Sequence, residues 1–228
     1  MQVELRHQPS FSVARLHLAA GEPARVESGA MLAHSWGVSL EAKVEGGLLK
    51  GLKRMALGGE SLFVTTYTAP PEGGWVDVAA NLPGDIRAEP VNPQRPLRIT
   101  RGCWIANSHA VQIETQWAGM QNLFGGEGGF IINAVGDGVV VLGAYGAIDE
   151  IVLGQNDMVT VDSGHVVAFD ATMQSRLRRA VEGRSIQSMK SGEGFVFDFA
   201  GPGRLLIQTR NPRALVEWLT ATLPFQRA

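Results

Sequence analysis

The fold is decided by residues 25–33, which read RVESGAMLA. The same pattern recurs at residues 98–106 as RITRGCWIA and at residues 160–168 as TVDSGHVVA. In each case an apolar residue, two polar residues and a glycine are followed by three variable residues and an alanine. Self-similarity of this kind is the sequence signature of a repeated architecture. We therefore expect three copies of one structural unit.

A second shared segment follows the first in every copy. It is a Gly-Glu pair shortly before a phenylalanine, and its glutamates are Glu60, Glu127 and Glu193. The spacing between the two segments varies only by lengths that a surface loop absorbs. We expect repeats at 1–92, 93–154 and 155–210, stacked around a pseudo-threefold axis, with a terminal segment at 211–228 and all parts packed as one compact unit.

Each unit has the composition of β-structure. The 28 glycines and 11 prolines are spread between short runs rich in Val, Ile, Phe and Thr, such as 62–67, 130–135 and 204–209. Runs of this length that end in turn residues are typical of strands. Gly136-Asp137-Gly138 lies between two such runs and favours a hairpin, because the turn needs a positive φ. The prediction is an all-β fold.

The C-terminus is the exception. Asn211 can cap a helix, Pro212 suits its first position, and apolar residues recur at helical spacing up to Pro224. This pattern predicts one amphipathic helix within 211–228. A second helical candidate at 48–57 is short and contains Gly51, so it would be marginal on its own.

Gly29, Gly102 and Gly164 occupy the same place in the three copies. Glycine is preferred where the backbone needs a positive φ, because it has no Cβ. We interpret these glycines as a backbone requirement at equivalent turns and not as ligand-binding residues.

Composition excludes several classes of protein. Hydrophobic residues make up 45% of the 228 residues and charged residues 18%, which supplies a core and excludes disorder as the main state. A net charge of −2 provides no chain-wide field that would attract nucleic acid or a membrane. The sequence has no apolar run that would span a bilayer, and its opening residues lack the pattern of a signal peptide. We expect a cytoplasmic protein.

The reactive residues form no catalytic constellation. Asp162-Ser163-Gly164 matches the aspartic-protease triplet, but these enzymes need two carboxylates that share a proton, and no second triplet exists. The five histidines include no pair at ligand spacing. Cys103 is the single cysteine, which excludes an internal disulfide, and its apolar neighbours indicate a buried thiol. We expect no catalytic residue, no metal site and no cofactor.

Two charged features have more than one interpretation. The equivalent acids Glu60, Glu127 and Glu193 could converge on a cation, although solvated turn acids are favoured. Two basic clusters could contact an anionic surface or form an ordinary charged rim. Their residues are Lys50, Lys53 and Arg54 in the first copy and Arg176, Arg178 and Arg179 in the third. The second copy has no such cluster.

Several stretches of the chain resemble a known family. Residues 46–54, 58–69 and 102–106, together with Gly84-Asp85-Ile86, are similar to the altered-inheritance-of-mitochondria twenty-four family, and the likeness covers nearly the whole chain. The resemblance implies a triplicated β unit similar to the tryptophan RNA-binding attenuation protein, of the β-sandwich or double-stranded β-helix kind. It also implies subunits joined into a ring, a trimer, and a role in inner-membrane organisation for the mitochondrial members. It implies no enzymatic activity and no catalytic residues.

These observations favour a non-enzymatic, homo-oligomeric β-repeat scaffold or interaction protein at a membrane surface, with an anionic membrane or another protein as its further partner. The alternative is a small-ligand or nucleic-acid binding protein with sites between repeats or subunits. Nucleic acid is the weaker candidate, because the attenuation protein repeats its basic set in every unit and the second copy here lacks one. The opening residues do not match a mitochondrial targeting segment, so we expect a bacterial cytosolic member.

Overall fold

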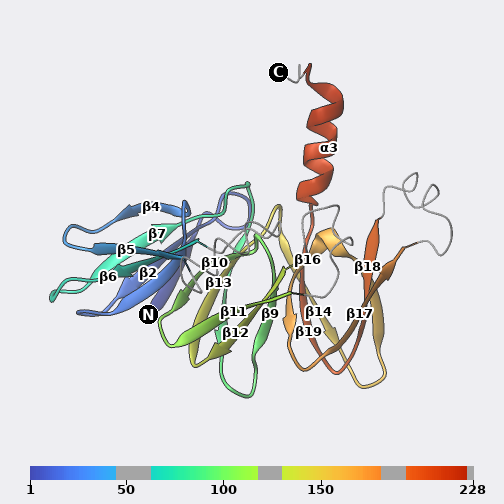
Figure 1. The fold of residues 1–228 in the computed structure, drawn as a ribbon, viewed down its shortest axis with the longest axis horizontal. Helices are drawn as coiled ribbons and strands as arrows, with labels where there is room; N and C mark the ends of the chain where they lie inside the picture. Colours follow the sequence, from blue (N-terminus) through green and yellow to red (C-terminus); the bar gives the residue numbers. More distant parts are fainter. Residues whose placement is uncertain (45–62, 118–129, 181–193, 225–228) are drawn as a thin grey trace.

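The computed structural model describes residues 1–44, 63–117, 130–180 and 194–224. It confirms a mostly β fold with one C-terminal helix (Figure 1). The strands before the first gap are β1 (Gln2–Arg6), β2 (Val13–Leu18), β3 (Pro23–Glu27), β4 (Met31–His34) and β5 (Ser39–Val44). Between the first and second gaps lie β6 (Phe63–Thr68), β7 (Gly74–Val78), β8 (Ile86–Val91), β9 (Leu97–Thr100), β10 (Trp104–Ser108) and β11 (Val111–Trp117).

The remaining strands follow residue 129. They are β12 (Phe130–Gly136), β13 (Gly138–Gly143), β14 (Ile148–Leu153), β15 (Met158–Asp162), β16 (Val166–Asp170), β17 (Gln174–Arg179), β18 (Phe195–Ala200) and β19 (Gly203–Gln208). A short 3-10 helix, η1 (Ser163–His165), connects β15 to β16, and the helix α3 (Pro212–Thr222) follows β19. Among the described residues, no helix is both long enough and apolar enough to cross a bilayer.

The strands β2–β7, β8–β13 and β14–β19 follow one pairing scheme. In each set of six, the first and third strands pair with the sixth, and the second and fourth pair with the fifth. All of these pairings are antiparallel. Successive side chains of a strand point to opposite faces of its sheet, so a strand with one face on the core alternates buried and exposed residues. In β2, for example, Ala14, Leu16 and Leu18 are buried and the residues between them are not.

Neighbouring sets are joined by two further pairings. β3 of the first set pairs with β10 of the second, and β9 of the second pairs with β16 of the third. The described strands therefore form sheets of four strands (β1-β2-β7-β4), six (β5-β6-β3-β10-β13-β8), six (β11-β12-β9-β16-β19-β14) and three (β15-β18-β17). The sheets lie next to one another across the width of the molecule (Figure 1).

The third strand of each set is interrupted by a register shift at the same position. The shifts lie between Met31 and Ala33 in β4, between Trp104 and Ala106 in β10, and between Val166 and Ala168 in β16. Each skips one residue, as a β-bulge does. This common irregularity aligns the three strands residue by residue, so that Leu32, Ile105 and Val167 correspond.

The hairpin predicted at Gly136-Asp137-Gly138 is wrong. β12 pairs with β11 and β9, whereas β13 pairs with β10 and β8, so the two strands belong to different sheets. The φ angles of Gly136 and Gly138 are 134° and 158°. A Cβ on Gly136 would lie 2.3 Å from the carbonyl oxygen of Ala110. Glycine therefore permits a tight corner between sheets here and not a turn within one.

The core consists of three clusters of buried side chains. Its largest fully buried members include Trp104, Phe169 and Phe199. The rings of Phe169 and Phe199 meet edge to face with their centroids 4.9 Å apart, a favoured aromatic geometry. This dense interior fixes the ends of the strands, and several of those ends converge at the side of the molecule from which α3 projects.

The terminal helix begins as predicted. Asn211 is the N-cap, and its side-chain oxygen accepts a hydrogen bond from the backbone N–H of Arg213 at 2.9 Å. Pro212 occupies the first turn. No residue of α3 is buried, and the helix projects away from the sheets (Figure 1). The second helical candidate, 48–57, lies outside the described residues.

Candidate functional site

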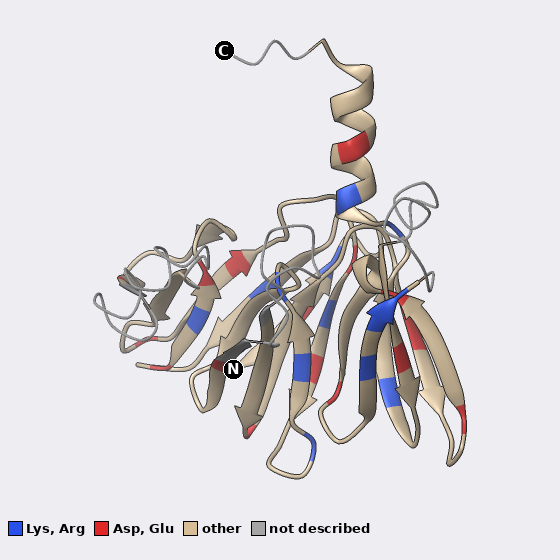
Figure 2. Ribbon diagram, turned by 45° about the vertical axis from the view of Figure 1, so that its right-hand side comes forward, with Lys and Arg blue, Asp and Glu red and all other residues tan. Residues whose placement is uncertain are grey.

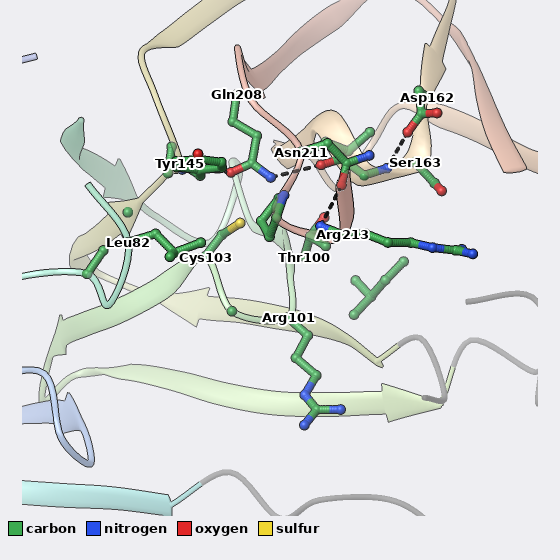
Figure 3. Close-up of a pocket in the computed structure, with 18 of the residues that line it drawn as sticks. Leu82, Thr100, Arg101, Cys103, Tyr145, Asp162, Ser163, Gln208, Asn211 and Arg213 are labelled. Atoms are coloured by element: carbon green, nitrogen blue, oxygen red, sulfur yellow. Dashed lines mark hydrogen bonds between the residues drawn. The ribbon is translucent and has the colours of Figure 1, made fainter. Parts of the chain in front are cut away.

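A cavity of about 500 Å³ opens at the side of the molecule from which α3 projects. It is lined by the end of β3, the β9–β10 turn, the end of β15 with η1, and the chain segments that follow β7, β13 and β19. Corresponding corners of all three strand sets thus meet around one space. Figure 3 shows Cys103, Thr100 and Gln208 near its middle, with Arg101 and Arg213 at its edge.

The floor of the cavity is apolar. The buried side chains of Cys103, Ile105, Val166, Phe169 and Phe197 line it. Cys103 lies in the β9–β10 turn, and the other four residues come from strands β10, β16 and β18, which also contribute to the core. The sequence left open a small-ligand site between repeats but did not indicate which residues line it, because the lining combines residues from all three strand sets.

The rim of the cavity is polar and carries both signs of charge. Arg101 and Arg213 contribute guanidinium groups, and Glu27 and Asp162 contribute carboxyl groups. Burial raises the pKa of Glu27, while the positive charge of Arg101 opposes that rise. The Asp162 carboxylate accepts a hydrogen bond from the Gly164 N–H at 2.7 Å. The Arg213 Nε donates to Glu217 on the next turn of α3 at 2.8 Å.

The wall near α3 is held by a buried amide. The Gln208 side chain is 5% exposed. Its Nε2 donates to the Gly164 carbonyl at 2.8 Å, and its Oε1 accepts from the Tyr145 N–H at 2.9 Å. The Gln208 carbonyl and the His165 Nδ1 are 2.7 Å apart. Gln208 therefore ties η1 to the segment after β13 and keeps this wall in place.

The thiol of Cys103 is buried in the floor of the cavity. Desolvation, with a smaller contribution from the nearby Glu27 carboxylate, raises the pKa of the thiol to about 12. Since the thiolate is the reactive form of cysteine, this side chain is an apolar surface at neutral pH and not a nucleophile.

The three predicted structural glycines are required for two different reasons. Gly29 and Gly102 have φ angles of 93° and 81°, with space for a Cβ, so the backbone is the reason for glycine at both. At Gly164, which lies in η1, a Cβ would be 2.2 Å from the Asn211 Nδ2. Glycine is needed there for close packing, and its φ lies outside the positive region. Gly102 and Gly164 line the cavity.

The predicted basic residues of the third copy lie on β17, away from the cavity. Arg178 is engaged by Asp198, with 2.6 Å between Nε and Oδ2. Arg176 and Arg179 are exposed. Figure 2 shows basic and acidic residues interleaved across the sheets.

The remaining predicted charged residues belong to the segments between the described ranges. The basic residues Lys50, Lys53 and Arg54 and the equivalent acids Glu60, Glu127 and Glu193 lie outside the described residues. Within the described ranges, the His, Cys, Asp and Glu side chains form no group of three that could hold a metal ion.

Comparison with known proteins places the chain in a family. It is 30% identical over 233 residues to the uncharacterized protein M6_Spy0233 of Streptococcus pyogenes serotype M6, covering 98% of this chain and 92% of the relative. The crystal structure of protein SPYM3_0169 from Streptococcus pyogenes matches with a TM-score of 0.82 and 28% identity, over 97% of this chain and 99% of that one. A family model described as Mitochondrial biogenesis AIM24 matches residues 3–210. With its sequence, its length and its fold all in agreement, the chain belongs to the AIM24 family.

Proposed function

We propose that this protein is a non-enzymatic scaffold built from three internal β repeats, which assembles with copies of itself by completing its β-sheets. The common pairing scheme supports the repeats. It favours units at 13–78, 86–143 and 148–208, with boundaries in the linkers 79–85 and 144–147 and not near 92 and 154. The raised pKa of Cys103 supports a non-enzymatic role, because it removes the one thiol as a nucleophile at neutral pH.

The observation that carries the proposal is the exposure of β4. Every residue of β10 is buried, and so are four of the five residues of β16, because β3 and β9 pair with these strands. β4 corresponds to them, yet it has no buried residue. Leu32 is 54% exposed, whereas its counterparts Ile105 and Val167 are 1% and 0% exposed. β4 therefore has an apolar sequence like that of a central strand. Among the described residues, however, one of its two edges has no neighbouring strand.

A complementary edge exists at the other end of the chain. β3 and β9 each have two neighbours, whereas their counterpart β15 pairs only with β18 among the described strands. Met158 on β15 is 72% exposed. Unpaired strand edges readily accept another strand. Pairing of β4 with β15 of a second copy would join the four-stranded and three-stranded sheets. The joined sheet would have the same strand order as the two six-stranded sheets, with β1 added at its edge.

The internal pairings also give the register of this contact. Ala106 lies opposite Val26, and Ala168 lies opposite Ile99. By correspondence, Ala33 lies opposite Val161 of a second copy, and His34 lies opposite Thr160. Because different edges meet, the contact is head to tail and generates a closed ring when the rotation closes. We propose the trimer that the family resemblance implies.

Solution mass tests the assembly. Light scattering on the purified protein is expected to give three times the 24.4 kDa of one chain. Leu32→Asp places an unpaired charge in the contact and is expected to give a monomer with an unchanged circular dichroism spectrum. Leu40→Asp is the matched control, because Leu40 is 49% exposed on the outer strand β5 and should leave the mass unchanged. A monomeric wild type, or a Leu32→Asp variant with the wild-type mass, would contradict the proposal.

A cross-link tests the register. The variant His34→Cys/Thr160→Cys places two thiols on opposing strands of different copies, while Cys103 remains buried. Oxidation is expected to produce covalent dimers and trimers, with no larger species in a three-membered ring. His34→Cys alone should give no ladder. Covalent species larger than trimers would show that the assembly is an open filament and not a closed ring.

We extend the proposal to contact with an anionic membrane surface. The exposed side chains of Arg176 and Arg179 support it, although Arg178 is held by Asp198. Flotation with anionic liposomes, with Arg176→Ala/Arg179→Ala and Lys50→Ala/Lys53→Ala/Arg54→Ala as variants, tests this role. If the wild-type protein stays in the bottom fraction, the membrane contact is wrong and the scaffold is unaffected.

A further inference from the structure

We propose that Trp36, in the turn between β4 and β5, is the anchor residue of the contact between copies, and that its indole packs against Met158 of a second copy. This inference rests on the assembly proposed above and identifies the side chains that hold it. Trp36 is 97% exposed and Met158 is 72% exposed. These are the two largest exposed fractions among the large hydrophobic residues that the structure describes.

The first step is that Trp36 has a counterpart in each of the other strand sets. The Ser35 Oγ accepts a backbone N–H of β7 at 3.0 Å, and the Ser108 Oγ accepts one of β13 at 3.1 Å. In the third set, the Asp170 Oδ2 accepts a backbone N–H of β19 at 2.9 Å. This repeated bond aligns the ends of the three strands independently of the β-bulge. The residue that follows begins a turn in every set, and these residues are Trp36, His109 and Ala171.

The second step is the contact that Ala171 makes. Its backbone N–H donates to the Pro96 carbonyl at 3.0 Å, so the turn after β16 closes onto the preceding strand set. This bond extends the register of β16 with β9 by one residue. Pro96 lies three positions before Ile99, and Met158 lies three positions before its counterpart Val161. Met158 therefore has the place in the third set that Pro96 has in the second.

The third step is that Trp36 and Met158 meet only between copies. β4 lies at one end of the molecule, and β18, the partner of β15, lies at the other (Figure 1). In the proposed pairing, the Trp36 N–H donates to the Met158 carbonyl of the second copy, as the Ala171 N–H does to Pro96. Opposite residues of antiparallel strands have Cβ atoms about 5 Å apart, a distance that an indole spans. The Met158 thioether then lies against an aromatic ring, which is a favourable contact for sulfur.

The fourth step is a comparison with the two junctions inside the chain. The residues in the same two positions are His109 with Pro23 at the first junction and Ala171 with Pro96 at the second. Strand sets of one chain are held together by their linkers, whereas two copies lose translational and rotational freedom when they associate. Trp is enriched among the few residues that dominate the binding energy of an interface. Trp36 and Met158 thus place a large apolar pair at the junction that has no covalent connection.

A dilution series tests the anchor. Trp36→Ala and Met158→Ala are each expected to raise the protein concentration at which the trimer is half dissociated by about tenfold or more, as measured by light scattering. Because the two side chains contact each other, the double variant should lose less than the sum of the two single effects. Trp218→Ala is the matched control, since Trp218 is 61% exposed on α3 and should leave the dissociation unchanged.

Fluorescence tests the burial of Trp36 without dissociating the assembly. The emission of Trp36 is obtained as the difference between the wild type and Trp36→Phe, and acrylamide quenching measures its accessibility. In the wild type we expect a blue-shifted emission that acrylamide quenches weakly. In the Leu32→Asp monomer we expect a red-shifted emission that is quenched strongly, because Trp36 is 97% exposed in a single chain.

The possible results separate the anchor from the assembly. A trimer in which Trp36 is quenched as strongly as in Leu32→Asp would overturn the anchor and leave the scaffold intact. The same conclusion follows if Trp218→Ala weakens the trimer as much as Trp36→Ala does, or if the effects of Trp36→Ala and Met158→Ala add fully. A wild type that is monomeric at every concentration would refute the assembly and the anchor together.

Discussion

At the scale of single residues, Asp77 has the most demanding environment in the first strand set. Its side chain is 10% exposed and lies between two arginines. Arg15 donates through Nε and one terminal nitrogen at 2.8 Å each, and Arg6 donates at 2.7 Å. The Arg15 guanidinium also stacks 3.9 Å from the Trp75 ring centroid. These contacts, led by the bond from Arg15, outweigh burial and lower the pKa of Asp77.

The lowered pKa gives a prediction about acid stability. A carboxyl group whose pKa is lower in the folded state stabilises that state above its unfolded pKa of 3.8, and the contribution disappears as the pH falls through the folded value. Asp77→Asn is expected to lower the free energy of unfolding at pH 7 by about 1–3 kcal/mol. The difference from wild type should shrink below about pH 4. Urea denaturation at pH 7 and pH 3 measures this effect, and an equal loss at both values would exclude the ionised carboxylate as its cause.

The glycines show how far sequence reasoning reaches at this scale. A shared pattern was enough to predict a positive φ at Gly29 and Gly102, because a turn conformation is a local property of the backbone. Gly164 has the same place in the pattern, but it is required by the Asn211 side chain, which is distant in sequence. Packing of that kind leaves no local signal. The residues that line the cavity were missed for the same reason.

At the scale of elements, α3 was predicted correctly because its signals are local. Asn211, Pro212 and the spacing of apolar residues are sufficient to specify a capped helix. The corner at Gly136-Asp137-Gly138 was predicted incorrectly, since two β runs around a turn do not reveal whether both strands enter one sheet. Local composition is enough to predict that a segment forms a strand, whereas the partner of that strand depends on the fold of the whole chain.

The isolation of α3 leads to a prediction about its stability. The helix has 11 residues, none of them buried, and one i,i+4 ion pair between Arg213 and Glu217. Helices of this length are marginal in water without tertiary contacts, and such a pair adds only a few tenths of a kcal/mol. Hydrogen exchange is therefore expected to show little protection at the amides of Leu215–Thr222.

The fully buried strand β10 provides the internal reference for that measurement. Its amides should exchange only through global unfolding, because both neighbours, β3 and β13, pair with it. Protection of α3 comparable to that of β10 would contradict a free helix and would mean that another surface covers it in solution.

At the scale of the whole molecule, the two six-stranded sheets are joined by a network of charges. Glu89 on β8 is 3% exposed and pairs with Arg87 and with Arg204 on β19 of the other sheet. Arg204 also approaches Glu150 and Asp170, at 3.6 and 3.7 Å. Residues 89 and 204 are 115 positions apart, so neither spacing nor composition could predict their contact. The network is a consequence of how the sheets pack.

The network gives the last prediction, which concerns the attachment of one six-stranded sheet to the other. Glu89→Gln removes a buried charge opposite Arg204, whose Nε has no hydrogen-bond partner among the described residues. The variant should lower the free energy of unfolding by about 3 kcal/mol. Glu150→Gln is the control, because its side chain is 28% exposed and an exposed pair contributes about 1 kcal/mol or less. Glu89→Leu/Arg204→Met should recover most of the lost stability, since an apolar pair leaves no uncompensated charge. Denaturant unfolding of the three variants measures these values. If Glu89→Gln and Glu150→Gln cost the same, the buried charge does not hold the sheets together, and apolar packing alone joins them.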